Sequence, residues 1–243
     1  MNLKMKLLRQ EFKFYISNEE IMFLKNSLKL IMKLDENSNK KKGFYTITSL
    51  YFDSPNKDAF NEKVDGIYSR EKFRIRKYSE SKIIKFESKK KMENVINKTS
   101  EIIDNDTVKY LFQNDIHLLN NAKSNFLKKS FALIKSNGLR AKNIVEYDRE
   151  AYYLPYGNIR ITFDTNLKTY NSNRNFFDKN KTSSPIFYDK INILEIKHSL
   201  PLPEHLKFIL KKITANRCAI SKFILSDKYT NLSPYQDNIV EPS

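Results

Sequence analysis

A regular alternation of charged and apolar side chains constrains the fold of this chain more than any other feature. In residues 70–78, REKFRIRKY, one side of the expected strand carries Lys72, Arg74, Arg76 and Tyr78. The other side carries Phe73 and Ile75. Residues 82–89 repeat the pattern, and the polar SES between the two segments predicts a hairpin.

Similar strand-like segments recur along the whole chain. They are residues 9–17, 44–54, 142–154, 159–165 and 186–199. Helical patterns occur at residues 17–34, 54–63, 104–136, 201–213 and 221–229. About eight strands with hairpin-like connections predict an antiparallel sheet, which can close into a barrel. We therefore expect an α+β fold, an eight-stranded antiparallel β-barrel with helices packed outside. One domain over residues 1–230 and a C-terminal tail at 231–243 are expected.

Two of the expected helices carry start signals. Ser17 is suited to be an N-cap, and Glu20 completes a capping box with it. Ser54 is a second candidate N-cap, with Pro55 at the first helical position. Both signals follow directly after an expected strand.

The charge balance predicts an anionic partner. The chain has 44 Lys and Arg residues against 28 Asp and Glu residues, a net charge of +16. Residues 70–98 alone carry eleven cations and four acids, which gives +7. Such an excess favours nucleic acid, an anionic membrane surface or a phosphorylated small molecule.

Several site classes are excluded by composition. Only four glycines occur, and neither GxGxxG nor GxxxxGK[ST] is present, which excludes the dinucleotide and P-loop motifs. A single cysteine, Cys218, forms no internal disulfide, and with three scattered histidines it predicts no zinc cluster. We expect a soluble, cytoplasmic protein, because the chain shows no signal peptide and no long apolar run.

The position of the charge leaves two interpretations open. A half-buried sheet with a solvated charged face explains any single strand. Several alike strands favour a closed barrel instead, because like charges crowded on one face repel unless an anion neutralises them. In such a tunnel each Arg–phosphate contact is strengthened. The acids Glu11, Glu87 and Glu195 can then hold a divalent metal.

A series of short motifs resembles a known family. They are EFKF, SLYFDS, RIR, KFESKKK, EYDREAY, RITFDT, LEIKHS and SKF, in this order. From Arg9 to Tyr229 the chain resembles the VTC (vacuolar transporter chaperone) polyphosphate polymerase domain, a branch of the triphosphate tunnel (CYTH-like) metalloenzymes. The resemblance implies a phosphotransferase. It would transfer the γ-phosphate of a nucleoside triphosphate, with ATP as the expected donor, onto polyphosphate.

The resemblance also implies the site residues and the cofactor. The implied phosphate contacts are Lys13, Lys63, Arg74, Arg76, Lys89, Lys98, Arg149, Arg160 and Lys222. The implied metal ligand is Glu195, with Glu11 and Glu87 as further candidates for Mn²⁺ or Mg²⁺. Arg74, Arg76, Lys222 and Glu195 are the expected catalytic residues. Strict alternation would put Arg149 on the same side as Val145 and Tyr147, so a bulge or a different alignment of this strand is also open.

Two alternative functions stay open beside polymerase. A triphosphatase would use water as the acceptor, and a binding module would hold polyphosphate or inositol phosphates without catalysis. No nucleic-acid partner is expected, because no aromatic RNP-like stretch is present. A membrane-protein partner at the inner face of a membrane is compatible with the polymerase interpretation. The aromatic residues of SLYFDS are expected in the core rather than against a nucleobase.

Overall fold

The computed structural model describes residues 9–39, 41–92, 95–113, 122–171, 176–178, 183–187 and 191–231. Eight of its strands follow one hydrogen-bonded path, β1-β10-β8-β7-β3-β4-β5-β6, and two short strands, β2 and β9, pair with β7 and β8. The registers described for β1–β10, β10–β8, β4–β5 and β5–β6 are all antiparallel. This set of strands with its helices confirms the predicted fold class. None of the described helices is long and apolar enough to cross a lipid bilayer.

The chain forms two compact units, and each is described by itself. Unit 1 comprises Met1–Ile47, Tyr147–Leu167 and Phe187–Ser221, and unit 2 comprises Thr48–Glu146, Lys168–Ile186 and Lys222–Ser243. Three strands have residues in both units: β3 (Tyr45–Asp53), β7 (Arg140–Leu154) and β8 (Ile159–Asn171).

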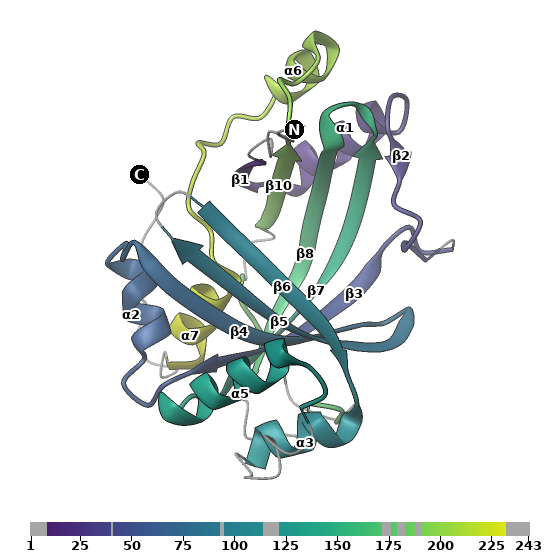
Figure 1. Ribbon diagram of the computed structural model, residues 1–243. Coiled ribbons are helices and arrows are strands. Elements are labelled where there is room, and N and C mark those ends of the chain that lie inside the picture. The colour runs from purple at the N-terminus through teal and green to yellow at the C-terminus, as the bar shows by residue number, and fades with distance from the viewer. Residues whose placement is uncertain are drawn as a thin grey trace, which may run out of the picture. The chain divides into compact units, whose positions relative to one another are not determined.

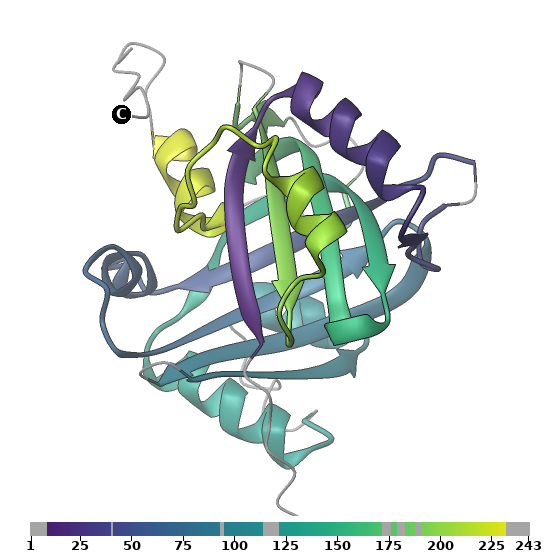
Figure 2. The ribbon, with the colours of Figure 1, turned by 90° about the horizontal axis from the view of Figure 1, so that it is seen from above.

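In unit 1, helices cover the apolar sides of the strands. The further elements of this unit are β1 (Gln10–Ile16), α1 (Asn18–Leu28), β2 (Lys33–Leu34), the 3-10 turn η1 (Tyr156–Asn158), β10 (Asn192–His198) and α6 (Glu204–Leu210). The predicted capping box at Ser17 and Glu20 is confirmed. Helices α1 and α6 lie over the same face of β1, β10 and β8 (Figure 2). Leu24 and Leu206 of these helices pack there against Phe163 and Ile196.

In unit 2, the hairpin predicted from the alternation forms and is joined by a third strand. The elements of this unit are α2 (Asp58–Val64), β4 (Ser69–Tyr78), β5 (Ser81–Met92), β6 (Val95–Ile103), α3 (Asn105–Gln113), α5 (Asn125–Ser136), β9 (Ser184–Pro185) and α7 (Lys222–Asn231). Helix α5 lies along β4, β5 and β6 (Figure 1), where Phe131 packs against Phe86. The apolar side of the predicted strands, Phe73 and Ile75, is therefore core.

The structure corrects several predicted boundaries. Strand β6 was not predicted, because its sequence is mostly polar and exposed and it becomes a strand by pairing with β5. Strand β8 continues to Asn171, beyond the predicted end at residue 165, and the last strand covers residues 192–198 rather than the predicted 186–199. Helices occur on both sides of residues 114–121, which lie outside the described residues. Of the predicted tail, only Asn231 is described, and it ends α7.

The predicted start of helix α2 is wrong by several residues. The helix begins at Asp58, not at Pro55. The buried carboxylate of Asp53 accepts hydrogen bonds from the backbone N–H groups of Ser54, Ala59 and Phe60, at 2.8, 2.8 and 3.3 Å. Asp53 thus accepts from the second and third N–H groups of the observed helix, in place of its N-cap residue, because a carboxylate presents two acceptor oxygens to this turn.

Candidate functional site

The charged face of β4, β5 and β6 in unit 2 carries cations in rows that cross the three strands. The rows are Arg70–Lys91–Ile96, Lys72–Lys89–Lys98, Arg74–Glu87–Ser100 and Arg76–Lys85–Ile102. Residues directly opposite each other in antiparallel strands lie on one face of the sheet. Eight of these twelve positions are Lys or Arg, and one is an acid. We call this surface the cationic face.

Glu87 is the acid on the cationic face, and three cations share it. Its carboxylate lies 2.6 Å from Arg74 Nε, 2.7 Å from Lys98 Nζ and 3.9 Å from a terminal nitrogen of Arg76. Burial alone raises the pKa of Glu87, but these cations outweigh burial and lower it to about 2. Glu87 is therefore ionised at neutral pH and neutralises only part of the surrounding positive charge.

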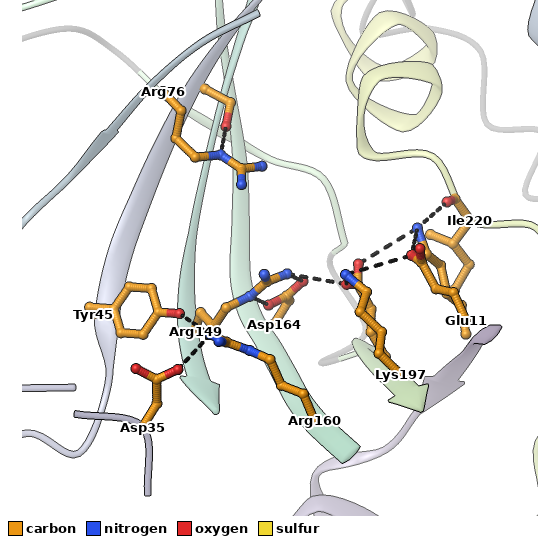
Figure 3. Close-up of polar contacts among 12 residues, drawn as sticks. Glu11, Asp35, Tyr45, Arg76, Arg149, Arg160, Asp164, Lys197 and Ile220 are labelled. Carbon is orange, nitrogen blue, oxygen red and sulfur yellow. Dashed lines mark hydrogen bonds and ion pairs between the residues drawn. The ribbon is translucent and has the colours of Figure 1, made fainter. Parts of the chain in front are cut away.

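Residues of β3 contact the arginines of the cationic face. Arg76 Nε donates a hydrogen bond to Ser49 Oγ at 3.3 Å (Figure 3), and the guanidinium of Arg74 lies 6.0 Å from the Tyr51 ring centre. Burial raises the pKa of the Tyr51 hydroxyl. The charges of Arg74, Arg76 and Lys222 outweigh this effect, so the pKa is lowered.

Lys222, the first residue of α7, is buried in unit 2 and acts electrostatically on the same tyrosine as the two arginines. Tyr51 and Phe52 are themselves buried, and Tyr51 packs on Phe223 at 5.4 Å between ring centres. The predicted core position of the SLYFDS aromatic residues is confirmed.

Unit 1 contains a second charged cluster, centred on Arg149. The Arg149 guanidinium binds Asp164 in two places, Nε to Oδ1 at 2.5 Å and a terminal nitrogen to Oδ2 at 2.6 Å (Figure 3). It also lies 3.4 Å from Glu195. Burial lowers the pKa of Arg149, but the two carboxylates outweigh burial and hold that pKa well above its ordinary value.

The side of β7 on which Arg149 lies follows from simple alternation. Val145, Tyr147 and Arg149 are all buried, and the Arg149 guanidinium lies 5.3 Å from the Tyr147 ring centre. This side of β7 is the one that meets Asp164 and Glu195. This side of β7 therefore carries both aromatic and charged residues, and no bulge is needed to explain the position of Arg149.

Glu195 and Glu11 share two lysines in the same unit (Figure 3). Lys13 Nζ lies 3.2 Å from Glu11 and 3.6 Å from Glu195, and it donates to the Ile220 carbonyl at 3.0 Å. Lys197 Nζ lies 3.2 Å from Glu195 and 3.9 Å from Glu11. Burial lowers the pKa of Lys197. The two carboxylates therefore face the same small volume.

Arg160 is held at the edge of this cluster. Its guanidinium lies 2.6 Å from Asp35 and donates to the Tyr45 hydroxyl at 3.0 Å (Figure 3). Burial raises the pKa of Tyr45. Asp35 carried no signal in the sequence, because it lies in a polar loop. Asp164 and Lys197 had one, since alternation places them beside Arg160 and Glu195.

The structure thus divides the predicted site residues between the two units. The cationic face and its surroundings in unit 2 hold Arg74, Arg76, Glu87, Lys89, Lys98 and Lys222. The cluster in unit 1 holds Glu11, Lys13, Arg149, Arg160 and Glu195. Lys63 belongs to α2, but its side chain lies outside the described residues. Lys72 and Lys85 are not among the phosphate contacts predicted from the sequence. They complete two of the cationic rows.

The carboxylates in unit 1 fit a Mg²⁺-like divalent metal that takes few ligands from the protein. No three Asp, Glu, His or Cys side chains in the described ranges gather as a metal-binding group. Mg²⁺ in phosphate-handling sites is bound by one or two carboxylates together with substrate oxygens and water. Glu195 and Glu11, which share both lysine partners, match that requirement. The cations around Glu87 lie closer, at 2.6 Å for Arg74 and 2.7 Å for Lys98, than the cations around Glu195, the nearest of which is Lys197 at 3.2 Å.

Solved structures of low sequence identity resemble this chain in fold. A putative adenylyl cyclase from Hippeastrum, HpAC1, described as revealing a dominant triphosphatase activity, is 15% identical, with 93% of this chain and 98% of that chain covered and a TM-score of 0.53. A putative adenylate cyclase from Bacillus halodurans is 13% identical, with 88% and 95% covered and a TM-score of 0.52. At these identities the likeness concerns the fold. No curated protein sequence matches. The family model "VTC domain" matches residues 8–230, which confirms the resemblance, so this chain belongs to the VTC domain family.

Proposed function

We propose that this protein is a metal-dependent polyphosphate polymerase. It transfers the γ-phosphate of a nucleoside triphosphate, with ATP as the expected donor, onto a growing polyphosphate chain. Family and fold support the coarser function, a tunnel-fold enzyme acting on triphosphates. The cationic face is the observation that supports the more specific function, polyphosphate polymerase. Eight cations against one acid, with three lysines abreast, suit a long polyanion better than a single small anion.

Phosphoryl transfer needs positioning and charge neutralisation more than covalent help. The attacking group in the proposed reaction is the end of a polyphosphate, which is already ionised at neutral pH. Arg74 and Arg76 present planar donor groups two residues apart on β4, suited to phosphate oxygens. Glu87 holds Arg74 in place, and Lys98 approaches the same carboxylate from β6.

The row Lys72–Lys89–Lys98 lies beside the arginines on the same face. Neighbouring strands are ~4.8 Å apart, so the three ammonium groups offer a line of positive charge across the sheet. In the proposed function this row holds the acceptor chain. Lys72 Nζ also donates to the Ala59 carbonyl at 2.7 Å, which fixes one end of the row.

Mn²⁺ or Mg²⁺ is the proposed cofactor, held by Glu195 and Glu11. Such a metal would supply Lewis-acid stabilisation of the charge that develops on the leaving diphosphate. In the same unit, Arg149 is positioned by Asp164, and Lys13 by the Ile220 carbonyl, so both cations are held in place before substrate binds.

A triphosphatase is the second candidate function. The paired carboxylates Glu11 and Glu195 favour it, because a carboxylate-bound metal can orient water. The HpAC1 protein, similar in fold, is described as having a dominant triphosphatase activity. A non-catalytic polyphosphate or inositol-phosphate binding module is the third. The proposal includes nucleoside triphosphate and polyphosphate as the partners. It also includes a cytoplasmic location at a membrane through a membrane-protein partner.

One experiment separates the three functions. The purified protein is incubated with ATP and Mn²⁺ or Mg²⁺, and the products are run on a gel stained for polyphosphate. A ladder supports polymerase, orthophosphate alone supports hydrolysis, and neither product supports a binding module.

Two variants test the site in the same assay. We expect Arg76→Ala and Glu195→Gln each to remove activity and to leave the circular dichroism spectrum unchanged. Lys128→Ala, an exposed lysine of α5, is the control and should keep full activity. Unfolding of the Arg76 or Glu195 variant at ordinary temperature would count against their assignment as site residues.

A further inference from the structure

One end of the cationic face carries an aromatic side chain and an exposed aliphatic side chain. The row Arg76–Lys85–Ile102 is followed on β4 by Tyr78, the last residue of that strand. Ile102 is 62% exposed although it lies on this face. Tyr78 thus lies two residues from Arg76 along β4, and the exposed side chain of Ile102 lies at the β6 end of the same row, beside Lys85.

A break in the strand register lies directly before Tyr78. The β4–β5 pairing shifts between Lys77 and Tyr78. Lys77 faces the helix-covered side, where its ammonium group lies 4.7 Å from the Phe176 ring centre and donates to the Phe176 carbonyl at 2.9 Å. Tyr78 lies on the other side, because Lys85 Nζ of the cationic face is 6.0 Å from its ring centre. Tyr78 therefore keeps the side that alternation with Arg74 and Arg76 predicts.

The order of groups along β4 matches the order of groups in a nucleotide. Tyr78 is followed at two-residue intervals by Arg76 and Arg74, which lie ~7 and ~13 Å along the strand. A nucleoside triphosphate carries a flat, largely apolar base at one end and its anionic phosphates at the other. Bases stack on aromatic side chains, and arginine binds phosphate oxygens.

We infer that Tyr78 and Ile102 form the platform for the nucleobase, with the triphosphate directed from Arg76 towards Arg74. This inference rests on the proposed function, since it takes a nucleoside triphosphate as the substrate. It also orients the reaction: the γ-phosphate end points to the row Lys72–Lys89–Lys98, and the growing chain leaves on the Arg70–Lys91 side. The opposite end row contains Ile96, on the same strand and face as Ile102 and 53% exposed.

The test compares binding of ATP with binding of inorganic tripolyphosphate, which has no base. Isothermal titration calorimetry measures both ligands on the wild type and on Tyr78→Ala, Tyr78→Phe, Ile102→Ser and Ile96→Ser. We expect Tyr78→Ala to weaken ATP about tenfold and Ile102→Ser about threefold. Tripolyphosphate binding should stay within about twofold for both, Tyr78→Phe should bind ATP as the wild type does, and Ile96→Ser should affect neither ligand.

The outcomes separate this inference from the proposed function. Equal weakening of both ligands by Ile102→Ser, or unchanged ATP binding in Tyr78→Ala and Ile102→Ser, overturns the platform. Ile102 is exposed, so its variant keeps the test valid if Tyr78→Ala fails to fold. A wild type that binds no ATP also overturns it. If ATP binding depends on the base but the gel assay shows no polyphosphate ladder, the platform is supported and the polymerase proposal is refuted.

Discussion

At the scale of single residues, Glu87 shows how a buried acid is kept ionised by its neighbours. Its side chain is 2% exposed, yet the pKa is lowered from 4.5 to about 2 because Arg74, Arg76 and Lys98 surround it. A group whose folded pKa is lowered stabilises the fold above its unfolded pKa. That stabilisation is lost as the pH falls from about 4.5 towards 2.

We therefore expect Glu87→Gln to reduce the free energy of unfolding at pH 7 by about 3 kcal/mol, the value that corresponds to this pKa change. The difference between wild type and variant should shrink as the pH falls below 4.5 and be small near pH 2. Urea unfolding at several pH values measures it. Glu36→Gln, an exposed glutamate, should retain the pH dependence of the wild type. A wild-type stability equal to that of Glu87→Gln at pH 7 would refute this account.

At the scale of elements, helix α2 depends on an acid that precedes it by several residues. Lys57, at the N-cap position, makes no side-chain cap and has a positive φ of 59°. Asp53 instead binds the N–H groups of Ala59 and Phe60, and Ser54 Oγ accepts only from Asp58, at 3.1 Å. Burial raises the pKa of Asp53 although these hydrogen bonds act against it.

Asp53→Ala should therefore destabilise the protein by about 1–2 kcal/mol, and more than Ser54→Ala, which removes a single hydrogen bond. Urea unfolding of both variants at pH 7 measures the difference. A larger loss for Ser54→Ala would mean that Ser54 caps the helix, as its sequence position suggested.

At the scale of the whole molecule, the charge of +16 has to be carried by the folded chain. Much of it is concentrated in the rows of the cationic face, where like charges lie directly opposite. Compact structure brings these charges closer than the unfolded chain does. A polyanion that binds only the folded state should therefore stabilise it.

Tripolyphosphate at a hundred times its dissociation constant should raise the free energy of unfolding by about 2.7 kcal/mol, which is roughly 5–10 °C in Tm. Thermal unfolding at constant ionic strength measures the shift. Lys89→Gln, which breaks the three-lysine row, should reduce it at the same ligand concentration. An equal shift from sodium chloride at matched ionic strength would show screening rather than binding.

The sequence alone was sufficient wherever the signal is local. Side chains in a strand alternate with a period of two, so it is possible to assign Arg74, Arg76 and Glu195 to charged sides without knowing any partner strand. The capping box of Ser17 and Glu20 is equally local, and the order of motifs identified the family. These signals determined the fold class and most candidate site residues.

Only the tertiary structure decided which charges meet. The pairing of Arg160 with Asp35, the contact of Lys13 with a carbonyl 207 residues away and the three-lysine row all depend on strand order and register. Strand β6 exists because β5 supplies its hydrogen bonds. Such contacts join segments far apart in the chain, and local periodicity specifies the face of a residue but not its neighbour across the sheet.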